Sequence, residues 1–252
     1  MSKVVSWNVN GIRSCARKGA LNLIWQSDAD VICLQEVKLS VASILSDIAP
    51  PKYQCYYNLS VNKGRSGVVV YTKTAPKAIF RKVGCRRFDV DGRFLCLDFD
   101  RYKLINLYLP HGGRDQKYMP YKMEAFQAVR EYIASLSDQN VLIATDFNMA
   151  AYDIDVCRAK NNRNNTMFTD AERQAVASME SIGYIDVFRK LYPDKEAYTW
   201  WSYSHRCRER NIGWRIDYFW GTETMMELVT DIHIETGIIG SDHCPLILKL
   251  KE

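Results

Sequence analysis

The order of the predicted elements favours an α/β fold in which two β-sheets face each other and helices cover their outer surfaces. Short apolar runs typical of strands fill both halves of the chain, and a long amphipathic helix is predicted between them at residues 121–136. The sequence contains no internal repeat, no low-complexity tract and no linker. We therefore expect one domain that spans residues 1–252.

The chain begins with a predicted strand at residues 3–7, which leads into the turn sequence Asn10-Gly11. Asn8 would lie at the end of this strand with its side-chain amide free to form hydrogen bonds. The spacing of the apolar residues that follow predicts a helix at residues 14–26, packed on a sheet.

The next apolar run, residues 31–34, is typical of a strand buried on both faces, and Glu36 follows it directly. A carboxylate at the end of a buried strand is costly unless a cation meets it. That cation could be the ammonium of Lys38 or a divalent metal ion.

Four further strands are predicted at residues 54–59, 67–72, 94–99 and 104–109. The last of them carries Tyr108 near its end and leads into a loop that contains His111 and Arg114. A tyrosine in this position most often serves packing, so Tyr108 alone is weak evidence for function.

Residues 141–144 form another buried-type run, and it leads to Asp146 and Asn148. Side chains two residues apart on an extended segment point to the same side, which suits gripping one small target. The asparagine-rich segment 161–165 is predicted as a loop that could also reach a phosphate backbone. The pair Thr169 and Glu172 is then typical of a capping box that opens a helix.

Aromatic and arginine side chains alternate between residues 198 and 220, as stacking on nucleotides beside phosphates would require. For residues 218–220 a core strand is the better interpretation. Asp217 lies at this strand, and the chain then reaches Asp242-His243, just before the apolar run 246–248. An acid beside a histidine there indicates a charged pair at the mouth of a strand.

The composition narrows the class of protein. A net charge of +5 favours a polyanionic partner if the excess is gathered on one face. The eight cysteines include no C-x-x-C pair and the N-terminus has no apolar signal region, so we expect reduced, mostly buried thiols in a cytoplasmic protein. Four histidines leave little for a structural zinc site, and no run approaches the roughly 20 apolar residues of a membrane span.

The polar residues at these strand ends are rich in oxygen donors, with one imidazole and no thiol cluster. Such donors suit Mg²⁺, or Mn²⁺ as a substitute, both of which keep bound waters and rely on substrate phosphate. The sequence therefore predicts metal-assisted attack of water on a phosphate ester.

Six motifs, in order, resemble those of the exonuclease III family of apurinic/apyrimidinic (AP) endonucleases. They are Ser6-Trp7-Asn8-Val9-Asn10-Gly11, Leu34-Gln35-Glu36-Val37-Lys38, Tyr108-Leu109-Pro110, Asp146-Phe147-Asn148, Trp214-Arg215-Ile216-Asp217-Tyr218 and Ser241-Asp242-His243-Cys244-Pro245. The resemblance covers essentially the whole chain. It implies a four-layered, deoxyribonuclease I-like α/β sandwich of two mixed sheets. It also implies an enzyme that cuts the DNA backbone 5′ to an abasic site, leaves a 3′-hydroxyl, and has 3′→5′ exonuclease or 3′-end-cleaning activity.

The resemblance also implies roles for individual residues. The implied catalytic residues are Asn8, Tyr108, Asp146, Asn148, Asp217 and His243. The implied metal ligands are Glu36, Asn10 and Asp242. The implied DNA-binding residues are His111, Arg114, Asn162, Asn165, Trp200, Trp214 and Ile216. Asp146 corresponds to the residue that positions and deprotonates water, and Asp217 corresponds to the acid paired with the catalytic histidine, His243.

Two departures from the family pattern bear on lesion preference. His111 stands where relatives usually have an amide, and the loop 202–206 lacks the apolar wedge that some relatives insert into the minor groove. The expected partner is double-stranded DNA with abasic or 3′-blocked sites, cut by a monomer that is cytoplasmic or, in a prokaryote, associated with the nucleoid. A phosphatase acting on a non-DNA substrate and a catalytically silent DNA-binding module are the alternatives.

Overall fold

The computed structural model describes residues 2–39 and 42–251, and its strands form two six-stranded sheets. The first sheet has the spatial order β11-β12-β1-β2-β4-β3, with bounds β1 (Ser2–Asn8), β2 (Val31–Gln35), β3 (Gln54–Asn58), β4 (Val68–Thr72), β11 (Val229–Ile234) and β12 (Leu246–Leu250). The second has the order β5-β6-β7-β8-β10-β9, with bounds β5 (Ala78–Phe80), β6 (Phe94–Asp98), β7 (Lys103–Tyr108), β8 (Val141–Asp146), β9 (Tyr184–Asp186) and β10 (Asp217–Thr222). Both sheets are mixed, because β1 pairs parallel with β2 and β7 pairs parallel with β8, whereas their other pairings are antiparallel.

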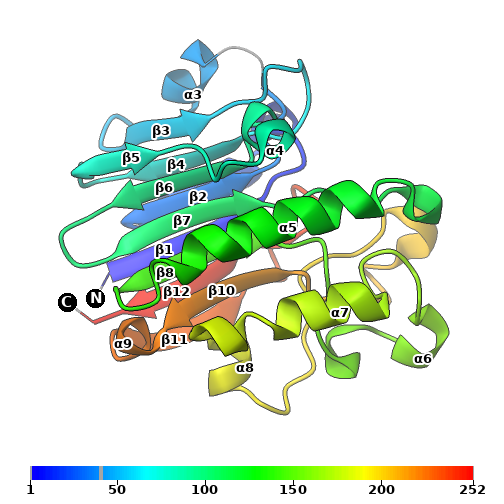
Figure 1. Cartoon of the computed structure of the whole chain (residues 1–252). Helices are drawn as coiled ribbons and strands as arrows, with labels where there is room; N and C mark the ends of the chain where they lie inside the picture. The colour runs from blue at the N-terminus through cyan, green and yellow to red at the C-terminus, as the bar shows by residue number, and fades with distance from the viewer. Residues whose placement is uncertain (1, 40–41, 252) are drawn as a thin grey trace.

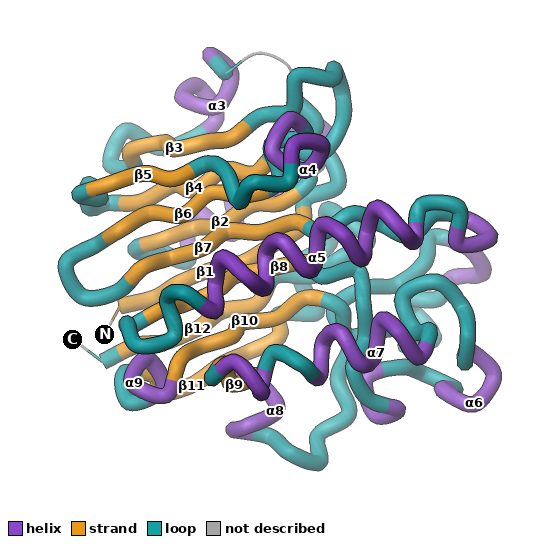
Figure 2. Tube along the Cα trace, viewed as in Figure 1, coloured by secondary structure: helices purple, strands orange, loops and turns teal. Residues whose placement is uncertain are grey.

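Helices lie outside the sheets, and Figure 1 shows α5 running across the second sheet with α7 and α8 beside it. The helices are α1 (Ile12–Arg17), α2 (Ala20–Gln26), α3 (Ser43–Ile48), α4 (Arg86–Val90), α5 (Met119–Ala134), α6 (Ala159–Asn162), α7 (Asp170–Ala177), α8 (Val187–Leu191) and α9 (Glu223–Met226). Four short 3₁₀ segments are η1 (Arg114–Gln116), η2 (Asp153–Asp155), η3 (Glu180–Ile182) and η4 (Ser204–Arg206). Figure 2 shows how much of the chain around α6 and α7 is loop.

The single helix predicted at residues 14–26 is wrong. The structure divides it into α1 and α2 at Gly19, whose φ of 73° places it in the left-handed region that glycine adopts without steric cost. The apolar spacing was nevertheless correct in its main point, because Ala20 and Ile24 pack against the first sheet.

Three apolar clusters separate four layers. On β8, Val141 and Ile143 pack with α5, whereas Leu142 and Ala144 point into the space between the sheets. This alternation follows from the opposite directions of successive side chains on a strand. A third cluster joins Trp7 of β1 to helix α2. The predicted sandwich of two facing sheets with outer helices is confirmed.

Other sequence predictions can be compared directly. The amphipathic helix is confirmed as α5, and Thr169 and Glu172 form the predicted capping box of α7. Residues 218–220 lie in the core strand β10. All eight cysteines are unpaired, and five of them are buried. Within residues 2–39 and 42–251, helices are too short or too polar to cross a membrane.

Candidate active site

Strand register brings polar residues from both sheets to one edge of the sandwich. In the second sheet, Asp146 of β8 lies opposite Tyr108 of β7 on one side and opposite Asp217 of β10 on the other. Because β7 and β8 are parallel and β10 is antiparallel, the ends of the first two strands meet the start of the third. In the first sheet, β12 runs antiparallel to β1, which carries His243 to the same edge as Asn8.

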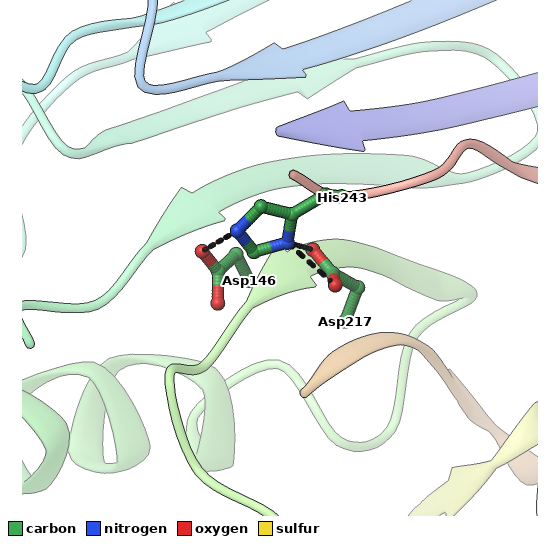
Figure 3. Close-up of side chains that lie close together, drawn as sticks. All are labelled: Asp146, Asp217 and His243. Atoms are coloured by element: carbon green, nitrogen blue, oxygen red, sulfur yellow. Dashed lines mark hydrogen bonds and ion pairs between the residues drawn. The ribbon is translucent and has the colours of Figure 1, made fainter. Parts of the chain in front are cut away.

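The centre of this edge is an acid–imidazole group, formed by Asp146, Asp217 and His243 (Figure 3). Nδ1 of His243 lies 2.9 Å from Oδ2 of Asp217, and Nε2 lies 3.9 Å from Oδ2 of Asp146. All three side chains are buried. The imidazole therefore has one bonded carboxylate and faces the other across a gap longer than a hydrogen bond.

The two carboxylates and the imidazole perturb each other. Burial alone lowers the pKa of His243, but the charge of Asp217 and the hydrogen bond to it outweigh burial and raise that pKa to about 10. Burial and then the charge of Asp217 raise the pKa of Asp146 to about 7. At neutral pH, His243 is therefore a cation, and Asp146 is close to its own midpoint.

Asn8 links this group to the rest of the edge. Its Nδ2 donates to Oδ2 of Asp146 at 2.7 Å and to Oε2 of Glu36 at 3.1 Å. The backbone N–H of Asn148 donates to Oδ1 of Asp146 at 2.7 Å. Asp146 is thus held by two amide donors, and the buried Asn8 fixes its distance from Glu36.

Beside Asn8, the edge opens into a lysine corner formed by Asn10, Glu36 and Lys38. Nζ of Lys38 lies 3.0 Å from Oε1 of Glu36 and also donates to Oδ1 of Asn10. The side chains of Lys38 and Glu36 are 35% and 19% exposed, so water reaches this pair. The sequence left a lysine and a metal ion as alternative partners for Glu36, and the structure places the lysine there.

The lysine corner also fits a divalent cation. Carboxylate and amide oxygens from two strand ends already converge on one positive charge, and such oxygens are the ligands that Mg²⁺ prefers. The acid–imidazole group fits a metal less well, because its imidazole is itself the cation between two carboxylates. Asp242, the third predicted ligand, lies next to the corner but accepts from Nδ2 of Asn10 at 2.8 Å and from Nε1 of Trp200 at 3.0 Å.

Four residues of this edge have a strained backbone conformation. Asn10, Glu36, Lys38 and Asn148 have φ values of 44°, 54°, 53° and 52°, in the left-handed region that non-glycine residues rarely adopt. Asn148 tolerates this conformation better than most residues, and its Nδ2 is bonded to the carbonyl of Leu109 at 3.0 Å. Strain of this kind persists where surrounding contacts enforce it, and it is common at functional sites.

Tyr108 completes the edge. Its phenol is buried, and burial together with the charge of Glu36 raises its pKa well above the usual value. The guanidinium of Arg93 lies over its ring at 4.7 Å. Tyr108 therefore keeps its proton and remains a hydrogen-bond donor at physiological pH.

A cavity of about 650 Å³ opens on the Trp200 side of the site. It is lined by six of the predicted DNA-binding residues: His111, Arg114, Asn162, Asn165, Trp200 and Trp214. Ile216, the seventh, is not at its surface and instead packs beneath Trp214 in a buried cluster. Gln116, Thr166 and Met167 also line the cavity and were not singled out from the sequence.

One buried ion pair supports both the site and this cavity. Lys122 of α5 and Glu172 of α7 have fully buried side chains and bond at 2.5 Å. Nζ of Lys122 also donates to the carbonyl of Asn148, and the carboxylate of Glu172 accepts from the backbone N–H groups of Met167 and Thr169. Sequence reasoning missed this pair, although Lys122 lies four residues before Phe126 and seven before Val129 and therefore on the apolar face of the helix.

Comparison with known proteins agrees with this geometry. Residues 5–243 match the model of the Endonuclease/Exonuclease/phosphatase family. An exodeoxyribonuclease of Bacillus subtilis is 40% identical over 98% of both chains, and the DNA repair nuclease APEX1 of Danio rerio is 35% identical over 98% of this chain and 82% of its own length. The crystal structure of an AP endonuclease from Leishmania major superposes with a TM-score of 0.91, at 28% identity, over 100% of this chain and 88% of that one.

Proposed function

Since the chain belongs to the endonuclease/exonuclease/phosphatase family, and within it to the exonuclease III group of AP endonucleases, we propose that it hydrolyses the DNA phosphodiester bond 5′ to an abasic site. The product is a 3′-hydroxyl, and the same site acts as a 3′→5′ exonuclease or removes blocking groups from 3′ ends. One observation carries the proposal: three features adjoin at one edge of the sandwich. The buried acid–imidazole group is linked through Asn8 to the lysine corner, and His243 pairs with Trp200, which lines the 650 Å³ cavity.

In this proposal Asp146 accepts a proton from the attacking water. A base with a pKa near the working pH is the most effective, and the pKa of Asp146 is raised to about 7. Asn8 and the N–H of Asn148 hold its carboxylate still, so the water it binds has a defined direction. The proton therefore moves to a carboxylate whose two oxygens are both held by hydrogen bonds.

His243 has the complementary role. Its cationic imidazole faces the place where a phosphate oxygen gains negative charge, and such a preorganised charge is worth more in a dry site than in water. Asp217 keeps the ring oriented and charged. The phenol of Tyr108 and the amide of Asn148 would add hydrogen bonds to the same phosphate.

Glu36 and Asn10 would hold a Mg²⁺ ion, replaceable by Mn²⁺, that supplies positive charge beside the scissile phosphate when bound. Asp242 orients Asn10 and Trp200, and so connects the lysine corner to the wall of the 650 Å³ cavity, which we call the sugar cavity. Trp200 and Trp214 would stack around the flipped-out abasic sugar, while Asn162, Asn165, Arg114 and His111 bind nearby phosphates. One chain supplies every one of these groups, which supports action as a monomer. The proposed location is the cytoplasm, with association to the nucleoid if the source is a prokaryote.

The test is cleavage of an end-labelled duplex that carries one tetrahydrofuran abasic analogue, with Mg²⁺ or with EDTA, beside an undamaged duplex. This analogue cannot undergo β-elimination, so a cut must be hydrolytic. We expect a Mg²⁺-dependent nick 5′ to the analogue and a 3′ end that a polymerase extends. A folded protein that leaves this duplex intact under both conditions would overturn the proposal and favour a phosphatase of the same family.

A further inference from the structure

Three buried polar side chains cross the interior of the sandwich directly below the active site. They are Ser6 of β1, Gln35 of β2 and Asn106 of β7, here called the polar rung, and each residue is at most 1% exposed. Ser6 lies two residues before Asn8, and Asn106 lies two residues before Tyr108. Because side chains two residues apart on a strand point the same way, the polar rung is the next layer beneath the site.

The polar rung joins the two sheets. β7 of the second sheet packs across β2 and β4 of the first (Figure 1). Nδ2 of Asn106 donates to the carbonyl of Leu34 at 3.1 Å and to the carbonyl of Val69 at 2.8 Å, which lie opposite each other on β2 and β4. Nε2 of Gln35 donates to Oδ1 of Asn106 at 2.9 Å and to Oγ of Ser6 at 3.0 Å. Three of these four hydrogen bonds cross from one sheet to the other.

The next layer away from the site is apolar. Two residues deeper on the same three strands stand Val4, Cys33 and Leu104, which pack in the cluster between the sheets. Apolar contacts have no preferred direction, whereas a hydrogen bond requires a defined distance and angle. The layer that can set the spacing of the sheets therefore lies next to the active site.

This layer is not the most stable way to fill the space. Oε1 of Gln35 is buried and has no hydrogen-bond partner among the residues that the structure describes. A buried acceptor that no protein group satisfies lowers stability, and an apolar side chain of the same volume would avoid that cost. The polar rung therefore fits a role in placing the sheets better than a role in stabilising them.

The spacing matters because the active site spans the gap between the sheets. Asn8 belongs to the first sheet, and its Nδ2 reaches Oδ2 of Asp146 on the second at 2.7 Å. Asn106 is paired with Ala144 of β8, two residues before Asp146, so a bond that fixes β7 also fixes Asp146. A displacement of one sheet against the other would change the distance between Asn8 and Asp146.

We propose that Asn106 and Gln35 are positioning residues of the active site. The polar rung sets the separation of the two sheets one layer below the site, and thereby the contact between Asn8 and Asp146. Both residues are buried, so they act through that contact and not by touching DNA. The effect on turnover rests on the proposed function, whereas the effect on the contact itself does not.

The first experiment measures cleavage of the tetrahydrofuran duplex by Asn106→Leu, which keeps the side-chain volume and removes its three hydrogen bonds. We expect kcat to fall roughly tenfold and KM to change less than about twofold, because a displaced general base costs rate while the DNA-binding surface is kept. Gln35→Met leaves both carbonyl bonds of Asn106 in place, so its loss of kcat should be smaller. It also carries the test if Asn106→Leu does not fold.

The second experiment needs no activity. The side-chain amide of Asn8 gives its own signals in a ¹⁵N–¹H correlation spectrum, and its bonds to Asp146 and Glu36 move those signals away from the position of a free amide. We expect the signals to move toward the free position in Asn106→Leu, and less far in Gln35→Met.

Leu104→Ala is the matched control. Leu104 lies on the same face of β7, two residues from Asn106, and its truncation leaves a cavity that lowers the Tm. We expect wild-type kcat, KM and Asn8 signals for this variant at a temperature where it is folded.

The outcomes separate the two proposals. A folded wild type that leaves the duplex intact would overturn the proposed function, and the Asn8 signals would still test the polar rung. The positioning role is overturned if those signals stay in place in both rung variants, or if they move as far in Leu104→Ala. It is also overturned if the rung variants lose Tm but cut with wild-type kcat.

Discussion

The acid–imidazole group and the lysine corner contain the same kinds of residue in opposite surroundings. At the acid–imidazole group, carboxylates and a cation are buried and held by amides, and pKa values move far from their usual range. At the lysine corner, the carboxylate of Glu36 and the ammonium of Lys38 meet in partial contact with water. A buried charge, such as that of His243, is permanent and shifts the pKa of the group that accepts the proton. A partly exposed carboxylate, such as Glu36, suits a metal ion that exchanges with solvent. Asn8 joins the two regions through one amide.

The largest effect is expected from Asp146→Asn, which removes the proposed base while keeping its shape. Turnover should fall by on the order of 10³-fold, because a positioned general base contributes roughly 10²- to 10⁴-fold. DNA affinity should change little, since Asp146 is buried behind Asn8 and Asn148. Single-turnover kinetics and fluorescence anisotropy measure the two quantities. An equal loss of affinity and turnover would mean that Asp146 binds DNA. The acid–imidazole group would then not differ in role from the lysine corner.

Glu36→Gln tests the corner with the smallest possible change in shape. We expect cleavage to fall about 10²-fold at a Mg²⁺ concentration that saturates the wild type, because the bound cation provides several kcal/mol of charge stabilisation. Raising the metal concentration should restore part of the activity, which it cannot do for Asp146→Asn. Glu223→Gln, on the surface helix α9, serves as control. Equal responses of both site variants to added metal would contradict separate roles.

The pH profile tests the buried group alone. For the wild type, kcat/KM should rise as Asp146 ionises near pH 7 and fall as His243 loses its proton near pH 10. In Asp217→Asn the anion that raises the pKa of His243 is gone, so the alkaline limb should move down by about one to three pH units. In the wild type, the raised pKa of His243 also stabilises the folded protein. This contribution is complete below about pH 6.5 and is lost as the pH rises through about 10. An alkaline limb that stays in place would mean that His243 is not the group titrating there.

The smallest effect is expected from Lys38→Gln. The ammonium of Lys38 competes with a metal ion for Glu36 and Asn10, so its removal should lower the Mn²⁺ concentration for half-saturation severalfold. Electron paramagnetic resonance measures Mn²⁺ binding without DNA, so changes in DNA binding do not affect the measured value. Lys63→Gln, on the exposed segment 62–65, is the control. Weaker Mn²⁺ binding in Lys38→Gln would show that the lysine assists the metal instead of standing in for it.

The sequence predicted the layers well because they depend on short-range patterns. Alternating or continuous apolar runs identified most of the strands, although the short strands β5 and β9 were not predicted, and helical spacing identified α5. The break at Gly19 was missed because the apolar spacing continues across it, and a single glycine is weak evidence against a helix. Local patterns therefore predicted the type of each element better than its limits.

The site was predicted from motifs more than from strand ends. Asn8, Tyr108 and Asp146 are the last residues of their strands, but Asp217 opens β10 and His243 precedes β12. Only the antiparallel pairing of those strands brings the last two residues to the same edge, and no local pattern reveals which strands pair. Lys122 and Glu172 lie outside the six motifs, and their ion pair depends on the packing of α5 against α7, which no local pattern reveals.

The ion pair of Lys122 and Glu172 has a consequence for hydrogen exchange. Separating α5 from α7 would leave a bare charge in the core, which costs several kcal/mol. The loop that carries Asn148 and the loop that carries Met167 and Thr169 are each bonded to one member of this pair, so both are fixed to the same two helices. Their amide protons should exchange with deuterium as slowly as those of the central strands, although both loops lie at the surface where DNA would bind.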